Sequence, residues 1–84
     1  MKLVVCAVHD KAVGAFLAPY FCRSKGEAIR AFTEACHDQG KPFGKNASDY
    51  TLYELGEYDD VGGVFQSHDP QRVLSALEVG SAAD

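Results

Sequence analysis

The sequence lacks the motifs by which many small enzymes and membrane proteins are recognised. No serine stands in a Gly-x-Ser-x-Gly elbow, and no glycine run forms a phosphate-binding loop. The apolar run at 1–8 is too short for a membrane span or a signal peptide, and His9, Asp10 and Lys11 follow it directly. We therefore expect a protein that is not an enzyme, binds no cofactor, does not enter a membrane and stays in the cytoplasm.

The sequence lacks any cysteine spacing typical of a metal or redox site. Cys6, Cys22 and Cys36 form no Cys-x-x-Cys pair, and three thiols cannot all pair with one another. Cys6 and Cys22 lie on strands predicted to be neighbours, which would permit a disulfide. Buried free thiols in a reducing cytosol are the simpler interpretation.

Positive charge is also in short supply. The net charge of -4 argues against an indiscriminate DNA-binding protein, because such binding depends on Lys and Arg side chains that neutralise phosphates. The charges are unevenly distributed, however. Residues 1–48 hold seven Lys or Arg against four Asp or Glu, whereas residues 49–84 hold one against eight. This asymmetry predicts a molecule with a basic and an acidic side.

The length of the chain sets the number of domains. At 84 residues it is large enough for one hydrophobic core and too small for two. A hydrophobic fraction of 46% closes that core with a thin margin, which self-association would supplement. We expect residues 1–80 to form a single domain that assembles as a homo-oligomer, and residues 81–84 to be a disordered tail.

The N-terminal half predicts two strands and a helix. Lys2–Val8 is apolar and β-branched, as in a strand central to a small sheet. Ala15–Cys22 predicts a returning strand, which Pro19 bends or places at an edge. The segment 24–27 (Ser-Lys-Gly-Glu) is a capping box, and apolar residues then recur at helical spacing until Gln39-Gly40.

The C-terminal half predicts a loop, two strands and a short helix. Residues 41–49 form the loop, with Phe43 as its anchor to the core, and residues 50–58 and 64–67 form the strands. Asp69-Pro70 fits the cap and first position of a helix through about position 77. The order β-β-α-β-β-α indicates an α+β fold, with one small antiparallel sheet and helices on one face.

Two segments give the chain a family resemblance. Residues 15–36 (AFLAPYFCRSKGEAIRAFTEAC) place a Pro-Tyr-Phe segment before a Gly-Glu-Ala-x-Arg-x-Phe helix, and residues 49–60 (DYTLYELGEYDD) are the more distinctive block. In both, the chain resembles the nonstructural protein of gokushoviruses, tailless phages of the Microviridae with single-stranded DNA genomes. The resemblance implies a helper of genome replication and packaging that contacts DNA or the replication complex in the host bacterial cytoplasm.

Basic residues flank the predicted helix and are the first candidates for DNA contacts. They are Arg23, Lys25, Arg30, Lys41 and Lys45. The first three surround the helix start, where free amides and the helix dipole also favour a phosphate. The alternative is a solvated helix end, with Arg30 paired to Glu27 or Glu34. The two lysines would extend the basic strip only if their loop folds back.

Aromatic rings are the second candidate element, because single-strand binders stack bases on exposed rings between basic groups. Six rings are available for this purpose: Phe16, Tyr20, Phe21, Tyr50, Tyr53 and Tyr58. Most of them must build the core of so small a domain. Tyr20 and Tyr53 are the better candidates, since a hydroxyl tolerates exposure.

A metal site is not expected, although histidine precedes aspartate three times, at 9–10, 37–38 and 68–69. No recurring ligand spacing places these side chains on one face of an element. Aspartate as a turn or cap residue explains their positions.

The sequence thus predicts a phage replication accessory protein that binds single-stranded DNA weakly, as a homodimer. The rival interpretation is an adaptor that docks a basic partner, the replication initiator or a capsid precursor, through the acidic residues at 49–60 without touching DNA.

Overall fold

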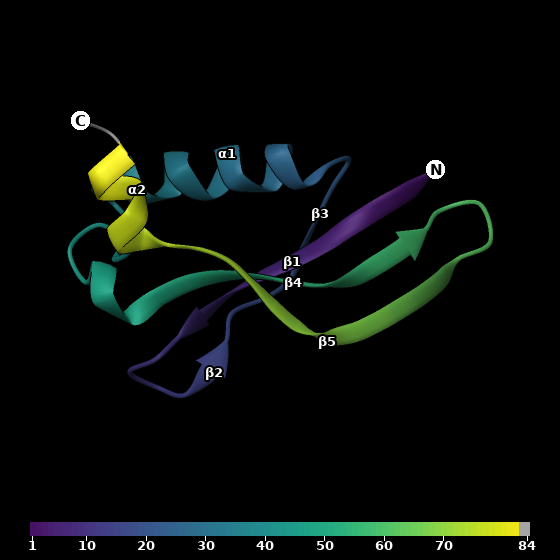
Figure 1. The fold of residues 1–84 in the computed structure, drawn as a ribbon, viewed down its shortest axis with the longest axis horizontal. Coiled ribbons are helices and arrows are strands. Elements are labelled where there is room, and N and C mark those ends of the chain that lie inside the picture. The colour runs from purple at the N-terminus through teal and green to yellow at the C-terminus, as the bar shows by residue number, and fades with distance from the viewer. Residues whose placement is uncertain (83–84) are drawn as a thin grey trace.

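The computed structural model describes residues 1–82, the last three by their backbone alone, as one antiparallel sheet with two helices on the same side (Figure 1). The elements are β1 (Lys2–Asp10), β2 (Ala15–Phe16), β3 (Tyr20–Cys22), α1 (Lys25–His37), the 3-10 turn η1 (Ala47–Asp49), β4 (Tyr50–Asp59), β5 (Val64–Ser75) and α2 (Ala76–Ala82). The α+β class and the antiparallel sheet are confirmed. Of the predicted tail at 81–84, residues 83 and 84 lie outside the described residues.

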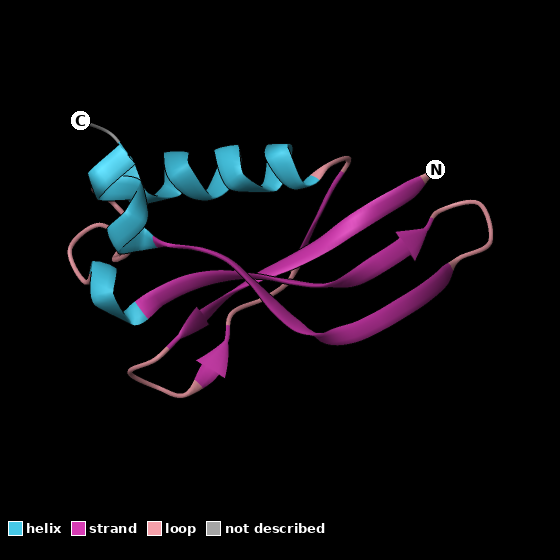
Figure 2. Ribbon diagram, in the orientation of Figure 1, coloured by secondary structure: helices cyan, strands magenta, loops and turns pink. Residues whose placement is uncertain are grey.

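The sheet has the strand order β2-β1-β4-β5, and β3 also pairs with β1 (Figure 2). β2 and β3 therefore share one edge of the sheet, and β5 forms the other. The single returning strand predicted over 15–22 is split in two around Pro19, which has no amide hydrogen to donate to β1. Within the described chain, no helix is both long and apolar enough to cross a membrane.

Helix α1 begins where the capping box predicts. The Ser24 hydroxyl accepts a hydrogen bond from the Glu27 amide at 3.1 Å, while the Glu27 carboxylate accepts from the Arg23 amide at 3.2 Å. The box thus reaches back one residue further than the usual pattern, in which the carboxylate meets the cap residue itself. The helix ends at His37, two residues before the predicted stop.

The prediction of a helix that starts at Asp69-Pro70 is wrong, because β5 continues through that segment to Ser75. The register of β4 and β5 jumps from Glu54↔Gln71 to Gly56↔Ser67, so Pro70 lies in a bulge of an edge strand. A proline is tolerated there because no ladder hydrogen bond is required of it.

A second capping box sets the true start of α2. The Glu78 amide donates to the Ser75 hydroxyl, and the Ser75 amide donates to the Glu78 carboxylate, both at 3.2 Å. Two donors at the helix start are satisfied reciprocally, which is the full form of the motif. This local signal, Ser-x-x-Glu at 75–78, outweighs the Asp-Pro pair upstream.

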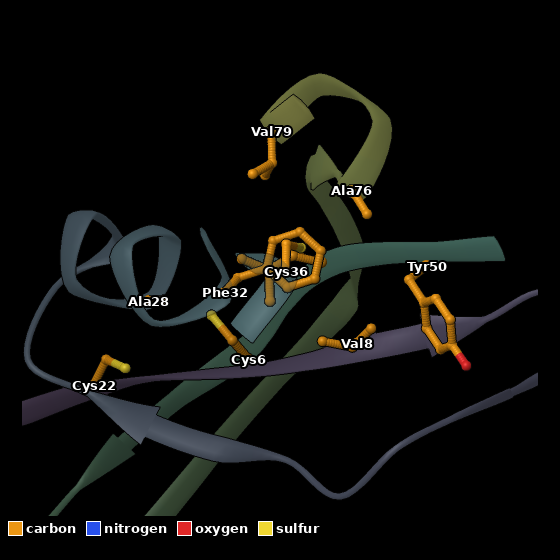
Figure 3. Packing of buried hydrophobic residues seen from close by; sticks show 10 residues of the cluster. Cys6, Val8, Cys22, Ala28, Phe32, Cys36, Tyr50, Ala76 and Val79 are labelled. Atoms are coloured by element: carbon orange, nitrogen blue, oxygen red, sulfur yellow. The ribbon is translucent and has the colours of Figure 1, made fainter. Parts of the chain in front are cut away.

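The hydrophobic core lies between the helices and the sheet (Figure 3). Its buried members are Cys6, Val8, Cys22, Ala28, Phe32, Cys36, Tyr50, Leu52, Ala76 and Val79. Phe43 anchors its loop as predicted, with its ring centroid 4.8 Å from Tyr50 and 6.1 Å from Phe32. All three cysteines are buried and free, and burial raises the pKa of the Cys6 thiol to about 11.

β4 and β5 approach each other closely at Gly56. A Cβ at this position would collide with the carbonyl oxygen of Gln66 and would lie 2.9 Å from the Cα of Ser67. Both obstacles are backbone atoms, so a side chain at position 56 would force the strands apart.

We predict that Gly56→Ala lowers the free energy of unfolding by roughly 1–3 kcal/mol, because the backbone must shift to admit the methyl group. Gly26→Ala is the matched control: it lies in α1, where the nearest atom to a new Cβ is 3.9 Å away. That variant should be neutral or gain up to roughly 1 kcal/mol from helix propensity. Chemical denaturation measures both, and equal effects would contradict the close approach.

Candidate nucleic-acid interface

The two faces of the sheet differ because the helices cover only one of them. Along β1, Cys6 and Val8 point into the core, so the alternating residues Val5 and Ala7 point to the opposite face. The register carries the alternation into β4, where Tyr53 lies opposite Ala7. We call the uncovered side the open face; it comprises Leu3, Val5, Ala7, His9, Phe16, Phe21, Tyr53, Tyr58 and Phe65.

The first aromatic cluster lies on the open face where β2, β1 and β4 run side by side. The ring centroids of Phe16 and Tyr53 are 5.5 Å apart, and His9 lies 4.8 Å from Phe16 and 6.1 Å from Tyr53, all edge to face. Phe16 remains 40% exposed. The cluster therefore presents ring surface to solvent as well as to its own members.

The second aromatic cluster combines rings from β3, β4 and β5. Tyr58 lies 4.6 Å from Phe65 and 5.5 Å from Phe21, and the two phenylalanines are 6.1 Å apart. They meet although β1 and β4 run between their strands; the register places Val5 and Gly56 in the row that starts at Phe21. Phe21 is 44% exposed and Phe65 63%. His9 and Val5 are four residues apart on β1, which places the clusters roughly 13 Å from each other.

The carboxylates of β4 point away from both clusters. Glu54 is paired opposite Cys6 and Glu57 opposite Val4, two residues that contact the core, so both carboxylates project on the helix side of the sheet. There they line a polar groove along β4 and β5 together with Gln66, Ser67, His68 and Gln71. Glu54 and Glu57 therefore do not place their charge on the open face.

The five predicted basic contacts lie at the two ends of α1 and along it, all exposed. Arg23 and Lys25 are at its start, and the Arg23 Nε lies 3.3 Å from the Glu27 carboxylate. The alternative interpretation paired Arg30 with Glu27 or Glu34, whereas the structure pairs Glu27 with Arg23. Lys41 and Lys45 follow the other end of a 13-residue helix, roughly 20 Å away. The structure thus places Arg23 and Lys25 at the start of α1, Arg30 along it, and Lys41 and Lys45 beyond its other end. The basic residues do not form one strip.

The two predicted stacking rings lie on opposite faces of the sheet. Tyr53 is on the open face, as a base-stacking role requires. Tyr20 is on the covered face, where its hydroxyl donates to the Ala28 carbonyl at 3.0 Å and burial raises its pKa above the ordinary value. Its hydroxyl is satisfied by the helix backbone, so Tyr20 belongs to the packing of α1 and is not available to a base.

Four Phe and Tyr rings of the open face were not selected from the sequence: Phe16, Phe21, Tyr58 and Phe65. Strand periodicity carried part of the signal, because Tyr20 and Phe21 are adjacent on one strand and must point to opposite faces. Arg72 was also missed. It lies opposite Tyr53 on β5 and makes an ion pair with Glu78.

His68 is held in the polar groove by two hydrogen-bond acceptors. Its Nδ1 lies 2.8 Å from the Asp69 carbonyl oxygen and its Nε2 lies 2.9 Å from a Glu54 carboxylate oxygen. The backbone contact and, next, the carboxylate raise the pKa of this imidazole above 6.5, because both favour the doubly protonated ring.

We predict that His68 titrates above the ordinary histidine value in an NMR pH titration, and that Glu54→Gln lowers its pKa. Since the folded pKa is raised, the stabilisation is complete below the unfolded value of 6.5 and is lost as the pH rises through the folded pKa. Glu34→Gln, on α1, is the control and should leave the titration unchanged. An unshifted His68 in the native protein would contradict the contact geometry.

The fold defines a small α+β domain whose sheet presents aromatic rings on an uncovered face. Residues 3–79, nearly the whole chain, match the family described as Phage ORF5 protein. The chain therefore belongs to the Phage ORF5 protein family and is a bacteriophage protein. No curated protein and no solved structure gives a significant match.

Proposed function

We propose that this phage protein is a non-enzymatic accessory protein of genome replication or packaging that binds single-stranded DNA weakly through the open face. The observation that carries the proposal is the pair of aromatic clusters on that face. Phe16, Phe21 and Phe65 are 40%, 44% and 63% exposed. Large apolar rings gathered on one solvent-facing surface are typical of a binding site.

The geometry of the open face suits base stacking. Recognition modules built on four-stranded sheets stack two or three bases on aromatic side chains of an uncovered face. Such stacking tolerates any sequence, because every base has a π-face. The two clusters offer two stacking positions on this sheet, and the carboxylates of β4 lie on its other side. The sheet would thus separate bound bases from the carboxylates of Glu54 and Glu57, which would repel the phosphates.

Cations at the border of the open face would contact the phosphates. Arg23 follows Phe21 of the second cluster by two residues, and Arg72 lies opposite Tyr53 of the first. Both are engaged in surface ion pairs with glutamates, which a phosphate would displace at small cost. With a net charge of -4, binding should be weak and strongly dependent on salt.

The biological setting of the proposal rests on family membership. The chain is a phage protein, and its segments 15–36 and 49–60 resemble the nonstructural protein of gokushoviruses. A phage of that kind, in the Microviridae, makes and packages a single-stranded genome in the host bacterial cytoplasm. A weak, sequence-tolerant single-strand binder would act on that genome, together with phage replication or capsid proteins.

We predict that removing one open-face ring weakens binding of a labelled single-stranded oligothymidylate by roughly tenfold, since stacking contributes about 1–3 kcal/mol per base. The variants are Tyr53→Leu and Phe65→Leu, which keep apolar bulk but lose the ring. Tyr53→Phe is the matched control and should bind as the wild type does. Fluorescence anisotropy at low salt measures all three, and wild-type affinity in both leucine variants would sink the proposed site.

The electrostatic part is tested by charge removal. Replacing Arg23, Lys25 and Arg30 together by alanine should weaken binding to every sequence and reduce the salt slope by about 0.7 for each phosphate that the variant no longer neutralises. Replacing Lys41 and Lys45 is the comparison, and its effect should be smaller because these lysines lie at the far end of α1. An unchanged affinity in the triple variant would remove the helix start from the interface.

The polar groove along β4 and β5 supports a second candidate function. Glu54, Glu57 and His68 line one concave surface on the helix side of β4 and β5, which is suited to a basic protein partner. In that case the protein would act on the replication initiator or a capsid precursor without binding DNA. A flat anisotropy titration even at low salt would favour this adaptor over the DNA-binding proposal.

A further inference from the structure

The two edges of the sheet are protected to different degrees. The β2 and β3 edge consists of strands of two and three residues separated at Pro19, which blunts it as a template for pairing. The opposite edge is β5, a strand of 12 residues that pairs only with β4 in the described chain. Where an edge strand lacks protective features, it is a site for β-strand addition.

The first part of β5 carries none of the usual protective features. Residues 61–68 contain no charged Lys, Arg, Asp or Glu and no proline. The bulge that contains Pro70 interrupts the strand only after this stretch. Val64 is 53% exposed and Phe65 63%, so apolar surface accompanies the free backbone.

The backbone groups of Phe65 and Ser67 face the free edge. The carbonyl oxygen of Gln66 is the nearest atom to a Cβ built at Gly56, so the polar groups of Gln66 point toward β4. Successive residues of a strand direct these groups to alternate sides. The amide and carbonyl groups of the two flanking residues therefore point outward, where a further strand would find them.

We propose that the segment Phe65–Ser67 pairs antiparallel with the same segment of a second copy of this chain across a two-fold axis at Gln66, so that Phe65 of each copy lies opposite Ser67 of the other. Pairing of identical edges closes after two copies, as isologous interfaces do. The edge formed by β2 and β3 is too interrupted to accept β5, so head-to-tail addition is disfavoured. Residues 61–67 carry no charged side chain, which lets two copies approach although each has a net charge of -4.

The pairing would join the two open faces into one continuous surface. Phe65, the most exposed of the clustered rings, lies on the strand next to the axis in each copy. The second clusters of the two copies would then be neighbours, giving a longer stacking platform for one DNA strand. This consequence rests on the proposed DNA binding, whereas the strand pairing itself does not.

The experiment is sedimentation equilibrium of the DNA-free protein. The wild type should have twice the monomer mass, and Ser67→Pro should be monomeric, because it removes an outward amide and inserts a ring at the edge. Ser67→Lys is the second variant and should also be monomeric, since a lysine side chain on an edge strand opposes pairing with another chain. Gln39→Lys, in the exposed loop after α1, is the control and should remain dimeric. Circular dichroism verifies that each variant is folded.

A monomeric wild type, or a dimer that persists in both folded Ser67 variants, would overturn the proposal. So would a dimer that is lost in Tyr53→Ser but kept in Ser67→Pro, because the copies would then pair through their open faces. Anisotropy with oligothymidylate separates this result from the proposed function. A wild-type dimer that depends on Ser67 but binds no DNA would leave the edge pairing intact and refute the DNA-binding proposal alone.

Discussion

The pairing register of β1 with β4 is the constraint on which the rest of this structure depends. Both helices lie on one side of the sheet, so they cover only one of its two faces. The register places Val8 and Leu52 together under the helices and Ala7 and Tyr53 together on the open face. A slip of one residue would exchange the faces, exposing the core and burying the open-face rings. Irregularities at positions 52–56 preserve this alternation while β5 bends around its bulge.

The same register separates the chemistry of the molecule. The carboxylates of Glu54 and Glu57 project on the helix side, while the rings of Tyr53 and Tyr58 project on the other. The rings contact one another edge to face or tilted, which offsets part of the cost of their exposure by about 0.5–1.5 kcal/mol per pair. The exposed ring surface therefore lies on the opposite side of the sheet from Glu54 and Glu57. This separation allows a protein of net charge -4 to be proposed as a DNA-binding protein at all.

Much of the fold follows from local signals in the sequence. The apolar run in β1, the capping box at Ser24 and the aromatic strand β4 each specify their element within a few residues. The last helix was misplaced because two cap signals compete, Asp69-Pro70 and Ser75 with Glu78. Local rules do not rank these signals. The edge position of β5 decides in favour of the second, since a bulge there accommodates the proline.

The candidate site followed from the sequence less completely. Strand alternation shows that Tyr20 and Phe21 point to opposite faces, but only the packing of α1 shows which face is covered. A hydroxyl group favoured Tyr20 as an exposed ring, yet the Ala28 carbonyl satisfies that hydroxyl beneath the helix. The expectation that most rings build the core was wrong because the helices leave one face of the sheet uncovered. Side chains on that face have no core to join.

The most direct test of this account is an NMR titration of the amide resonances of the labelled protein with a single-stranded oligonucleotide. The account predicts that the largest shifts map to the open face, at Val5, Ala7, Phe21 and Tyr53, with smaller shifts at Arg23. Shifts confined to Glu54, Glu57 and His68 on the helix side, or no shifts at low salt, would contradict the claim that the uncovered sheet face is the functional surface.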